Sequence, residues 1–198
     1  PDKRSPFALL AALPRLRRIM MAAVLVISAQ AILESISALW AFKRFGFGPR
    51  DTGLLLLSLA MIAVIMQGGM VRVLVPRFGE QRLAIFGAFA YIVGLAIVAI
   101  APGFAVAIVG LACCGVGVGL YQPCASALAS KESNENNRGV VMGTFQSSSS
   151  LARIIGPSLS GPVFGMWGMS APFVAGIVLV VPALALLMSL PPGQHTEG

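Results

Sequence analysis

Residues 145–161 read FQSSSSLARIIGPSLSG, a stretch that places a full positive charge, Arg153, inside an otherwise membrane-spanning run. An arginine near the centre of a bilayer costs at least ~2.5 kcal/mol, so it normally faces protein or a water-filled cavity and finds an anionic partner. The chain has seven acidic residues, and all but Glu34 lie in segments that we interpret as loops or tails. Glu34 is therefore the candidate partner of Arg153.

The composition indicates an integral membrane protein. Of the 198 residues, 57% are hydrophobic and 11% are charged, with a mean hydropathy of +0.88, whereas a soluble domain has about 25% charged residues. Charges separate apolar runs close to the ~20 residues that cross a ~30 Å hydrocarbon core. Because each span must satisfy its own backbone hydrogen bonds, we predict an all-α fold. The six predicted transmembrane helices are residues 18–41, 52–71, 83–101, 104–129, 139–164 and 171–190.

The net charge of +7 follows the positive-inside pattern of membrane proteins rather than a nucleic-acid surface. Ten bases lie on one side of the predicted spans and three on the other, which places both termini in the cytoplasm. We divide the chain into a basic linker (residues 1–17), a six-helix domain (18–190) and a tail (191–198). The opening residues resemble no signal peptide, and we expect a piece of a longer protein.

The cysteines and the histidine predict no reactive centre. Cys113, Cys114 and Cys124 fall in the fourth span, where we interpret them as small packing residues. His195 lies in the polar tail, so no metal cluster can be assembled. We therefore predict no metal, no cofactor and no enzymatic nucleophile site.

Polar stripes on the first and fifth spans predict faces that meet protein or water. On the first span, Gln30, Glu34 and Ser37 follow helical spacing. On the fifth, Gln146 and Arg153 belong to a stripe that also includes Ser149, Ser150, Pro157 and Ser160, and the serines are expected to hydrogen-bond to the preceding turn. Spans three and six are nearly featureless and are expected to face lipid.

Glu34 and Arg153 are expected at nearly equal depth. Glu34 lies 16 residues beyond Arg18, about 24 Å, and Arg153 lies 15 residues beyond Arg138, about 22 Å. If the two helices are neighbours, the charge state of Glu34 would depend on the position of Arg153, which is what proton coupling requires. The alternative is a permanent ion pair that joins two helices and never titrates.

Two glycine-containing segments are expected to bring helices close together. Gly115, Gly117 and Gly119 predict close packing of the small-xxx-small kind. Four charged residues lie in a very short turn after the second span. One interpretation is that they mark the topology and form solvated ion pairs. The alternative is a gate that forms and breaks charge contacts with helix ends. These residues are Arg72, Arg77, Glu80 and Arg82.

In the fourth span, Tyr121 and Gln122 precede Pro123, which is expected to kink the helix and shape a binding site.

Several motifs occur in a familiar order. They are ESIS at 34–37, KRFG at 43–46, QGG at 67–69, RFGEQR at 77–82, YQP at 121–123, and RG at 138–139 followed by SLARIIGP at 150–157. Nearly the whole chain thereby resembles the C-terminal half of a major facilitator superfamily transporter, most similar to the drug/proton antiporter branch that includes tetracycline exporters. The loop containing Gly79 resembles the superfamily's conserved cytoplasmic loop in a degenerate second copy, with Arg72 and Pro76 at the earlier glycine and acid positions.

The resemblance implies which helices surround a central cavity. In each half the first and fourth helices line it, the second and fifth form the interface between halves, and the third and sixth face lipid. Carried over to this sequence, the cavity residues are Gln30, Glu34, Tyr121 and Gln122, with Gln146 and Arg153 at the edge. The gating loop would comprise Arg72, Arg77, Gly79, Glu80 and Arg82.

The predicted function is therefore half of a secondary active transporter that exports small amphipathic compounds in exchange for protons by alternating access. Glu34 would accept the proton, with Arg153 as its modulating partner. The alternatives are an importer or facilitator of a metabolite, or a membrane assembly subunit without transport. The expected surroundings are a bacterial inner membrane and either an N-terminal half, in the same or a separate chain, or a second copy of this unit.

Overall fold

The computed structural model describes residue 10, residues 13–135 and residues 137–190. Every regular element within these ranges is a helix. In chain order they are α2 (Pro14–Phe45), α3 (Pro49–Ile65), the five-residue π-helix η1 (Met66–Met70), α4 (Val71–Phe78), α5 (Glu80–Ile100), α6 (Phe104–Lys131), α7 (Arg138–Trp167) and α8 (Ala171–Met188). The predicted tail, the histidine within it and most of the predicted linker lie outside the described residues.

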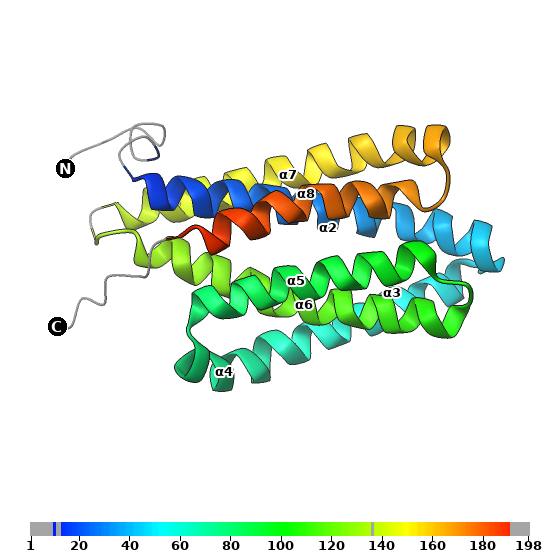
Figure 1. The fold of residues 1–198 in the computed structure, drawn as a ribbon, viewed down its shortest axis with the longest axis horizontal. Coiled ribbons are helices and arrows are strands. Elements are labelled where there is room, and N and C mark those ends of the chain that lie inside the picture. Colours follow the sequence, from blue (N-terminus) through cyan, green and yellow to red (C-terminus); the bar gives the residue numbers. More distant parts are fainter. Residues whose placement is uncertain (1–9, 11–12, 136, 191–198) are drawn as a thin grey trace.

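The helices form six rods that run along the long axis of the molecule, because α3, η1 and α4 follow one another without a break (Figure 1). Five of the rods are long and apolar enough to cross a membrane: α2, the combined α3–η1–α4, α5, α6 and α8. The remaining rod, α7, has 30 residues and carries the serine run and Arg153. The predicted all-α membrane fold of six helices is confirmed.

The bundle has two distinct ends. We call the end that holds Pro14, Glu80 and Arg138 the near end, and the opposite end, which holds Phe104 and Trp167, the far end. Helix α2 packs chiefly against α7 and α8, whereas α6 packs against α5 and α3 (Figure 1). The combined rod α3–η1–α4 is the least buried of the five apolar rods, because it rests mainly on α6.

Glycines set the close approach of α6 to its neighbours, as predicted. A Cβ atom at Gly117 would lie 2.7 Å from the backbone nitrogen of Tyr91 in α5, and one at Gly119 would lie 2.8 Å from the carbonyl oxygen of Ala63 in α3. At Gly115 the nearest atom would be the carbonyl oxygen of Leu59, at 3.0 Å. Successive glycines therefore pack α6 alternately against α3 and α5.

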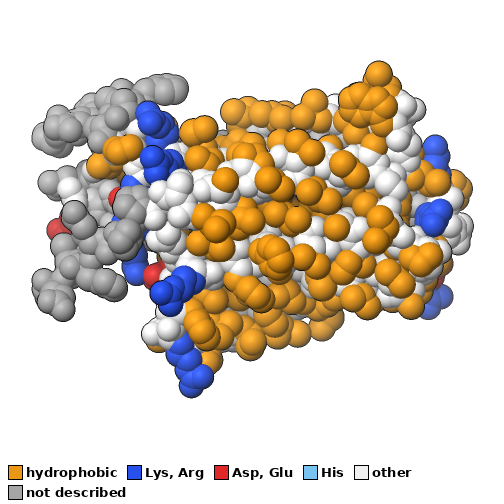
Figure 2. Space-filling view, in the orientation of Figure 1, with side chains coloured by type: hydrophobic (Ala, Val, Ile, Leu, Met, Phe, Trp, Pro, Cys, Tyr) orange, Lys and Arg blue, Asp and Glu red, His pale blue; other side chains and the backbone are white. Residues whose placement is uncertain are grey.

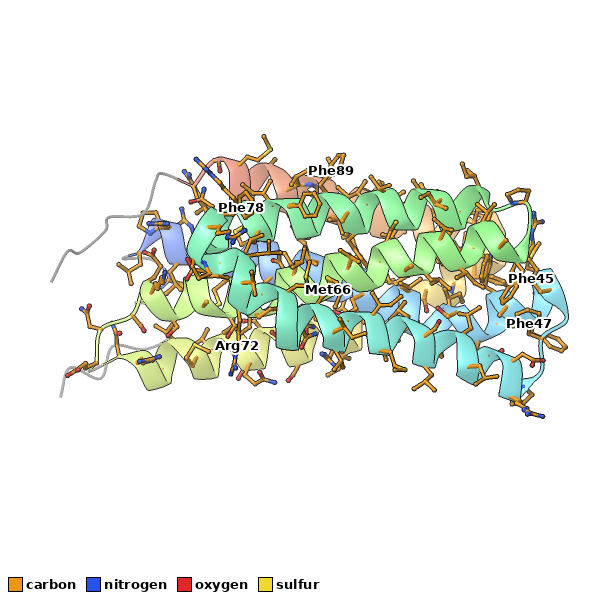
Figure 3. The ribbon with its side chains drawn as sticks, turned by 90° about the horizontal axis from the view of Figure 1, so that it is seen from below. Phe45, Phe47, Met66, Arg72, Phe78 and Phe89 are labelled. Atoms are coloured by element: carbon orange, nitrogen blue, oxygen red, sulfur yellow. The ribbon has the colours of Figure 1, made fainter. Side chains whose placement is uncertain are left out.

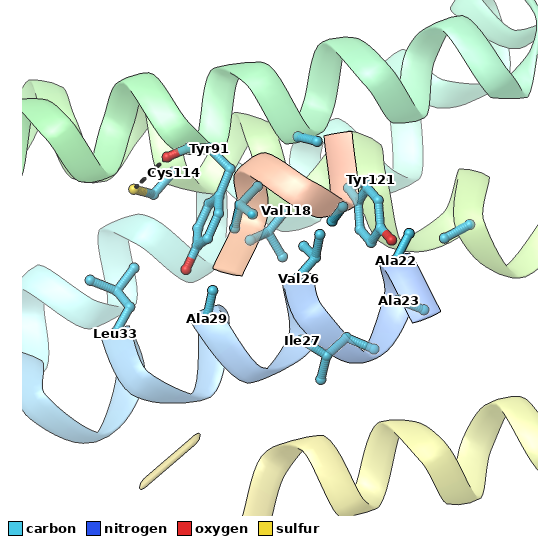
Figure 4. Packing of buried hydrophobic residues seen from close by; sticks show 14 of the residues in the cluster. Ala22, Ala23, Val26, Ile27, Ala29, Leu33, Tyr91, Cys114, Val118 and Tyr121 are labelled. Atoms are coloured by element: carbon cyan, nitrogen blue, oxygen red, sulfur yellow. Dashed lines mark hydrogen bonds between the residues drawn. The ribbon is translucent and has the colours of Figure 1, made fainter. Parts of the chain in front are cut away.

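The core lies where α2, α5, α6 and α8 meet (Figure 4). Tyr91 of α5 and Tyr121 of α6 are fully buried there, and the Cys114 thiol donates to the Tyr91 carbonyl. Span three was expected to face lipid, but only one side of α5 is exposed, the side that carries Phe86 and Phe89. Its other side contributes to the core.

The face shown in Figure 2 is an apolar band bounded by charged groups at both ends. At the far end, Phe45 and Phe47 form an aromatic cluster with Phe104 and Trp40, with ring centroids 5.0 to 6.0 Å apart for successive contacts (Figure 3). Phe42 is exposed, as expected for an interfacial belt residue, whereas Trp40 is buried against Phe173 of α8. The aromatic side chains at the far end therefore include both an exposed residue, Phe42, and a core residue, Trp40.

Candidate functional site

Three polar side chains form a hydrogen-bonded chain between α2 and α6. The amide nitrogen Nε2 of Gln122 donates to Oε1 of Gln30 over 3.0 Å, and Nε2 of Gln30 donates to Oε1 of Glu34 over 2.7 Å. Gln30 and Glu34 lie one turn apart on α2, so a single amide can reach both the carboxylate and the neighbouring helix. Gln30 thus links Glu34 to α6.

Gln122 also lines a cavity of about 280 Å³ bounded by α2, α6, α7 and the π-helix. Three other residues that were predicted to line a cavity or to lie at its edge line this one: Tyr121, Gln146 and Arg153. The remaining wall consists of Ile27, Gln67, Pro123, Ala125, Ser126, Phe145 and Ser149. The structure therefore places the predicted cavity residues of α6 and α7 at one cavity, with Gln30 and Glu34 attached to it through Gln122.

Gln67 was not predicted at this cavity, and its position depends on η1. A π-helix has a wider turn than an α-helix and locally changes which side chains share a face. Figure 3 shows Met66, the first residue of η1, near the middle of its rod. The glycine pair after Gln67 was the available sequence signal, since such residues accompany irregular helix geometry.

Two of the four serines in the run at residues 147–150 of α7 bond to the preceding turn, as predicted. The hydroxyl of Ser149 donates to the carbonyl of Phe145 over 2.8 Å, and that of Ser150 donates to the carbonyl of Gln146 over 3.0 Å. These bonds satisfy the hydroxyl groups within their own helix. The Arg153 guanidinium lies one turn beyond Ser149 on α7 and is the charged group of this polar stripe.

The expected direct ion pair between Glu34 and Arg153 is not formed. Among the described residues the ion pairs are Arg15 with Glu132 at 3.2 Å and Lys131 with Glu80 at 2.6 Å. Glu34 bonds to Gln30 instead.

The reason is the register between α2 and α7. Ser35 Oγ and Ser160 Oγ share a hydrogen bond of 2.9 Å, and a Cβ atom at Gly156 would lie 2.6 Å from the carbonyl oxygen of Ser28. Arg153 therefore lies level with about Ser28, which is six residues, or about 9 Å along the helix axis, from Glu34. The expectation of equal depth was wrong, because it assumed that Arg18 and Arg138 start at the same level.

The residues of the predicted gating loop lie at the near end, away from the cavity, but most of them are helical. Arg72 and Arg77 belong to α4, and Glu80 and Arg82 belong to α5, so only Gly79 forms the turn. Gly79 has a φ of 78°, a left-handed conformation that separates α4 from α5. Glu80 pairs with Lys131 at the end of α6, and the neighbouring Gln81 donates to the Leu187 and Leu190 carbonyls at the end of α8. The loop thus joins three helix ends. Arg72, Arg77 and Arg82 are exposed, and Figure 3 shows Arg72 on this same stretch.

Two bases at the far end, which the positive-inside count did not explain, have local partners. Lys43 Nζ lies 5.0 Å from the centre of the Phe164 ring, and Arg44 donates to the Ala101 carbonyl over 3.1 Å. These contacts join the end of α2 to α7 and to the loop before α6.

Within the described part of the chain, no group of three or more His, Cys, Asp or Glu residues is placed to hold a metal ion.

Comparison with known families matches residues 1–157 to the model of the Major Facilitator Superfamily. The chain is 29% identical over 199 residues to tetracycline resistance protein, class G, of Vibrio anguillarum, covering 96% of this chain and 48% of that protein. It is 28% identical over 153 residues to multidrug resistance protein 2 of Bacillus subtilis (strain 168), covering 75% of this chain and 37% of the relative. The chain thus spans about half the length, or less, of these relatives.

Solved structures with the same fold include the human organic anion transporter MFSD10 (TETRAN), with a TM-score of 0.84 at 24% identity over 92% of this chain and 46% of that one. A peptide transporter POT has a TM-score of 0.78 at 19% identity over 87% of this chain and 37% of that one. Both similarities concern the fold.

Proposed function

The chain belongs to the major facilitator superfamily, and from this membership we propose that it is the six-helix C-terminal half of a proton-coupled exporter of small amphipathic compounds. The relatives named for tetracycline resistance and multidrug resistance support export. The share of their length that it covers supports the assignment as one half. Superfamily transporters work by rocking two such halves around a site near the bilayer midplane.

The observation that carries the proposal is the polar path from the cavity to Glu34 through Gln122 and Gln30. A carboxylate within a spanning helix is costly and marks an ion or proton pathway by default. Glu34 is the proton acceptor in this mechanism. Arg153 lines the cavity and acts on Glu34 through the electric field and through bound substrate, because the two groups make no direct contact here.

The exposed groups support a second half that completes the site. Glu34 and Arg153 are both exposed on this chain, although lipid would not tolerate either charge. A homologous six-helix unit facing α2 and α7 would cover them and leave a water-filled cavity between the halves. The near end is assigned to the cytoplasm of a bacterial cell, because it carries most of the basic residues.

The test is proton movement in proteoliposomes that hold this chain together with its other half. A panel of amphipathic compounds of both charges, which includes tetracycline-like compounds, organic anions and lipophilic cations, is added to the wild type, to Glu34→Gln and to Glu135→Gln, a control that neutralises an exposed acid of the loop before α7. Substrate-triggered proton movement is expected in the wild type and the control, and is lost in Glu34→Gln. Unchanged movement in Glu34→Gln would remove this residue from the mechanism, whereas none in any protein would favour a facilitator or an assembly subunit.

A further inference from the structure

The cavity carries one formal positive charge and no negative one. Its eleven lining residues include Arg153 but no Asp or Glu. For a site that exports cations, the opposite balance would be expected, because like charges repel in a medium of low dielectric constant. The sign of this charge bears on the class of substrate.

No described acid compensates the Arg153 guanidinium. Glu80 and Glu132 are paired with Lys131 and Arg15 at the near end. Glu34 is held by Gln30, about one and a half turns beyond Arg153 in depth. The other described acids, Asp51 and Glu135, are exposed in the first turn of α3 and in the loop before α7. Within the described chain the arginine is therefore a charge without a partner.

The hydrogen-bonding groups beside Arg153 suit an acceptor. A guanidinium presents five N–H donors in a planar fork that matches carboxylates and related oxyanions. The amides of Gln67 and Gln146 line the same cavity and make no side-chain hydrogen bond with another described residue. By contrast, the Ser149 hydroxyl already donates to its own helix. The donors of the cavity without a partner in the described chain thus include the Arg153 guanidinium and the amides of the two glutamines, together with the buried Tyr121 hydroxyl.

Aromatic and apolar side chains complete the wall. Tyr121 and Phe145 are both buried and line the cavity, as do Ile27 and Pro123. Apolar walls with a few convergent polar groups are typical of sites for small organic molecules. A volume of about 280 Å³ lies near the lower end of the usual range for such sites, and the second half would enlarge it.

We infer that this cavity takes small aromatic organic anions, whose carboxylate, sulfonate or phenolate group binds to Arg153 while the ring packs against the apolar part of the wall beside Ile27 and Phe145. This inference rests on the proposed function, because it names the substrate class of the same cavity. Lipophilic cations would meet the guanidinium without a compensating acid in the cavity. The site therefore selects by charge before it selects by shape.

Equilibrium binding to this chain assembled with its other half tests the inference without any transport step. The assembled protein is placed in nanodiscs of zwitterionic lipid, so that lipid headgroups add no net negative charge. Two dyes that share a xanthene ring system are compared by fluorescence polarisation: fluorescein, which is anionic above neutral pH, and rhodamine 6G, which is cationic. Anionic phosphatidylglycerol, introduced in a second set of nanodiscs, shows whether a lipid headgroup competes for the same arginine.

The variants are Arg153→Gln, Arg153→Lys and Arg50→Gln. Arg50 is exposed at the far end, so its loss changes the net charge equally while leaving the cavity intact. Circular dichroism and size-exclusion chromatography confirm that each variant is folded.

Fluorescein is expected to bind more tightly than rhodamine 6G. Arg153→Gln should weaken fluorescein binding by about tenfold or more, which equals about 1.4 kcal/mol, and should leave rhodamine binding equal or stronger. Arg153→Lys should retain part of the affinity, since it keeps the charge but loses the planar fork. Arg50→Gln should bind as the wild type does.

Tighter binding of rhodamine, equal losses in Arg153→Gln and Arg50→Gln, or no saturable fluorescein binding would each overturn the inference. Displacement of fluorescein by phosphatidylglycerol alone, with no difference between the two dyes, would assign Arg153 to lipid instead. Failure of the proposed transport function has a separate signature, because it appears as absent proton movement irrespective of which dye binds.

Discussion

At the scale of single residues, Gln30 connects the cavity with Glu34, since its amide accepts from Gln122 and donates to Glu34. A carboxylate only accepts hydrogen bonds, whereas a protonated carboxyl group also carries a donor. On the proposed mechanism, protonation of Glu34 would favour rotation of the Gln30 amide, with its oxygen toward Glu34 and its nitrogen toward Gln122. Protonation of Glu34 on α2 would thus change the hydrogen bonding of Gln122 at the cavity wall on α6.

Gln30→Leu is expected to uncouple substrate from proton while leaving the fold intact. The substitution keeps a similar size but removes both hydrogen bonds, which contribute about 0.5 to 1.5 kcal/mol for the amide pair and about 1.5 to 3 kcal/mol for the bond to a carboxylate. The ratio of protons to substrate moved in proteoliposomes should fall by about tenfold, the equivalent of about 1.4 kcal/mol, while downhill substrate movement persists. Gln81→Leu is the control, because its bonds to the end of α8 lie at the near end. Equal coupling in Gln30→Leu and the wild type would contradict this role.

At the scale of the elements, the helices and their polar faces follow from the sequence, but the register between helices does not. Apolar runs and helical spacing predicted six spans and placed Gln146, Ser149 and Arg153 on one face. The depth of Arg153 relative to Glu34 depends on Gly156, which lets α7 approach the backbone of α2 near Ser28. The number of residues between a flanking base and a buried position does not predict that contact, because the helices begin at different levels along the bundle axis.

Gly156→Ala is expected to destabilise the bundle and disturb the site. A Cβ atom there would lie 2.6 Å from the Ser28 carbonyl oxygen and 2.8 Å from Ala31 Cβ, so the two helices must separate. Overpacking of this kind costs about 1 to 3 kcal/mol, and should appear as a lower thermal midpoint in detergent.

Gly165→Ala is the matched control on the same helix, since nothing lies within 4 Å of its Cβ position. Alanine also favours a helix interior over glycine, by up to about 1 kcal/mol. This variant should therefore unfold at the same temperature as the wild type or slightly above it. A lower midpoint in Gly165→Ala than in Gly156→Ala would show that packing between α2 and α7 does not limit stability.

At the scale of the whole molecule, the exposed surface has two kinds of face. Along α2, Glu34 and Ala38 lie one turn apart and are both exposed. On α8, Val174 and Val178 are exposed, and that helix is predicted to face lipid. Both faces are exposed in this chain. If the proposed second half leaves a water-filled cavity over α2, the α2 face meets water and the α8 face meets lipid.

Cysteine labelling of the complete transporter separates the two solvents, because a thiol reacts as its thiolate, which requires water. In a background with Cys113, Cys114 and Cys124 replaced by alanine, we expect Ala38→Cys to react quickly with a membrane-impermeant maleimide. The wild-type Val178 is 64% exposed. Val178→Cys should nevertheless react only with a lipid-soluble thiol reagent that does not need bulk water. Fast reaction at both positions would mean that α8 also borders water, and no reaction at Ala38→Cys would mean that the second half or lipid seals the α2 face. Only the expected pattern leaves Glu34 open to the proton that the mechanism assigns to it.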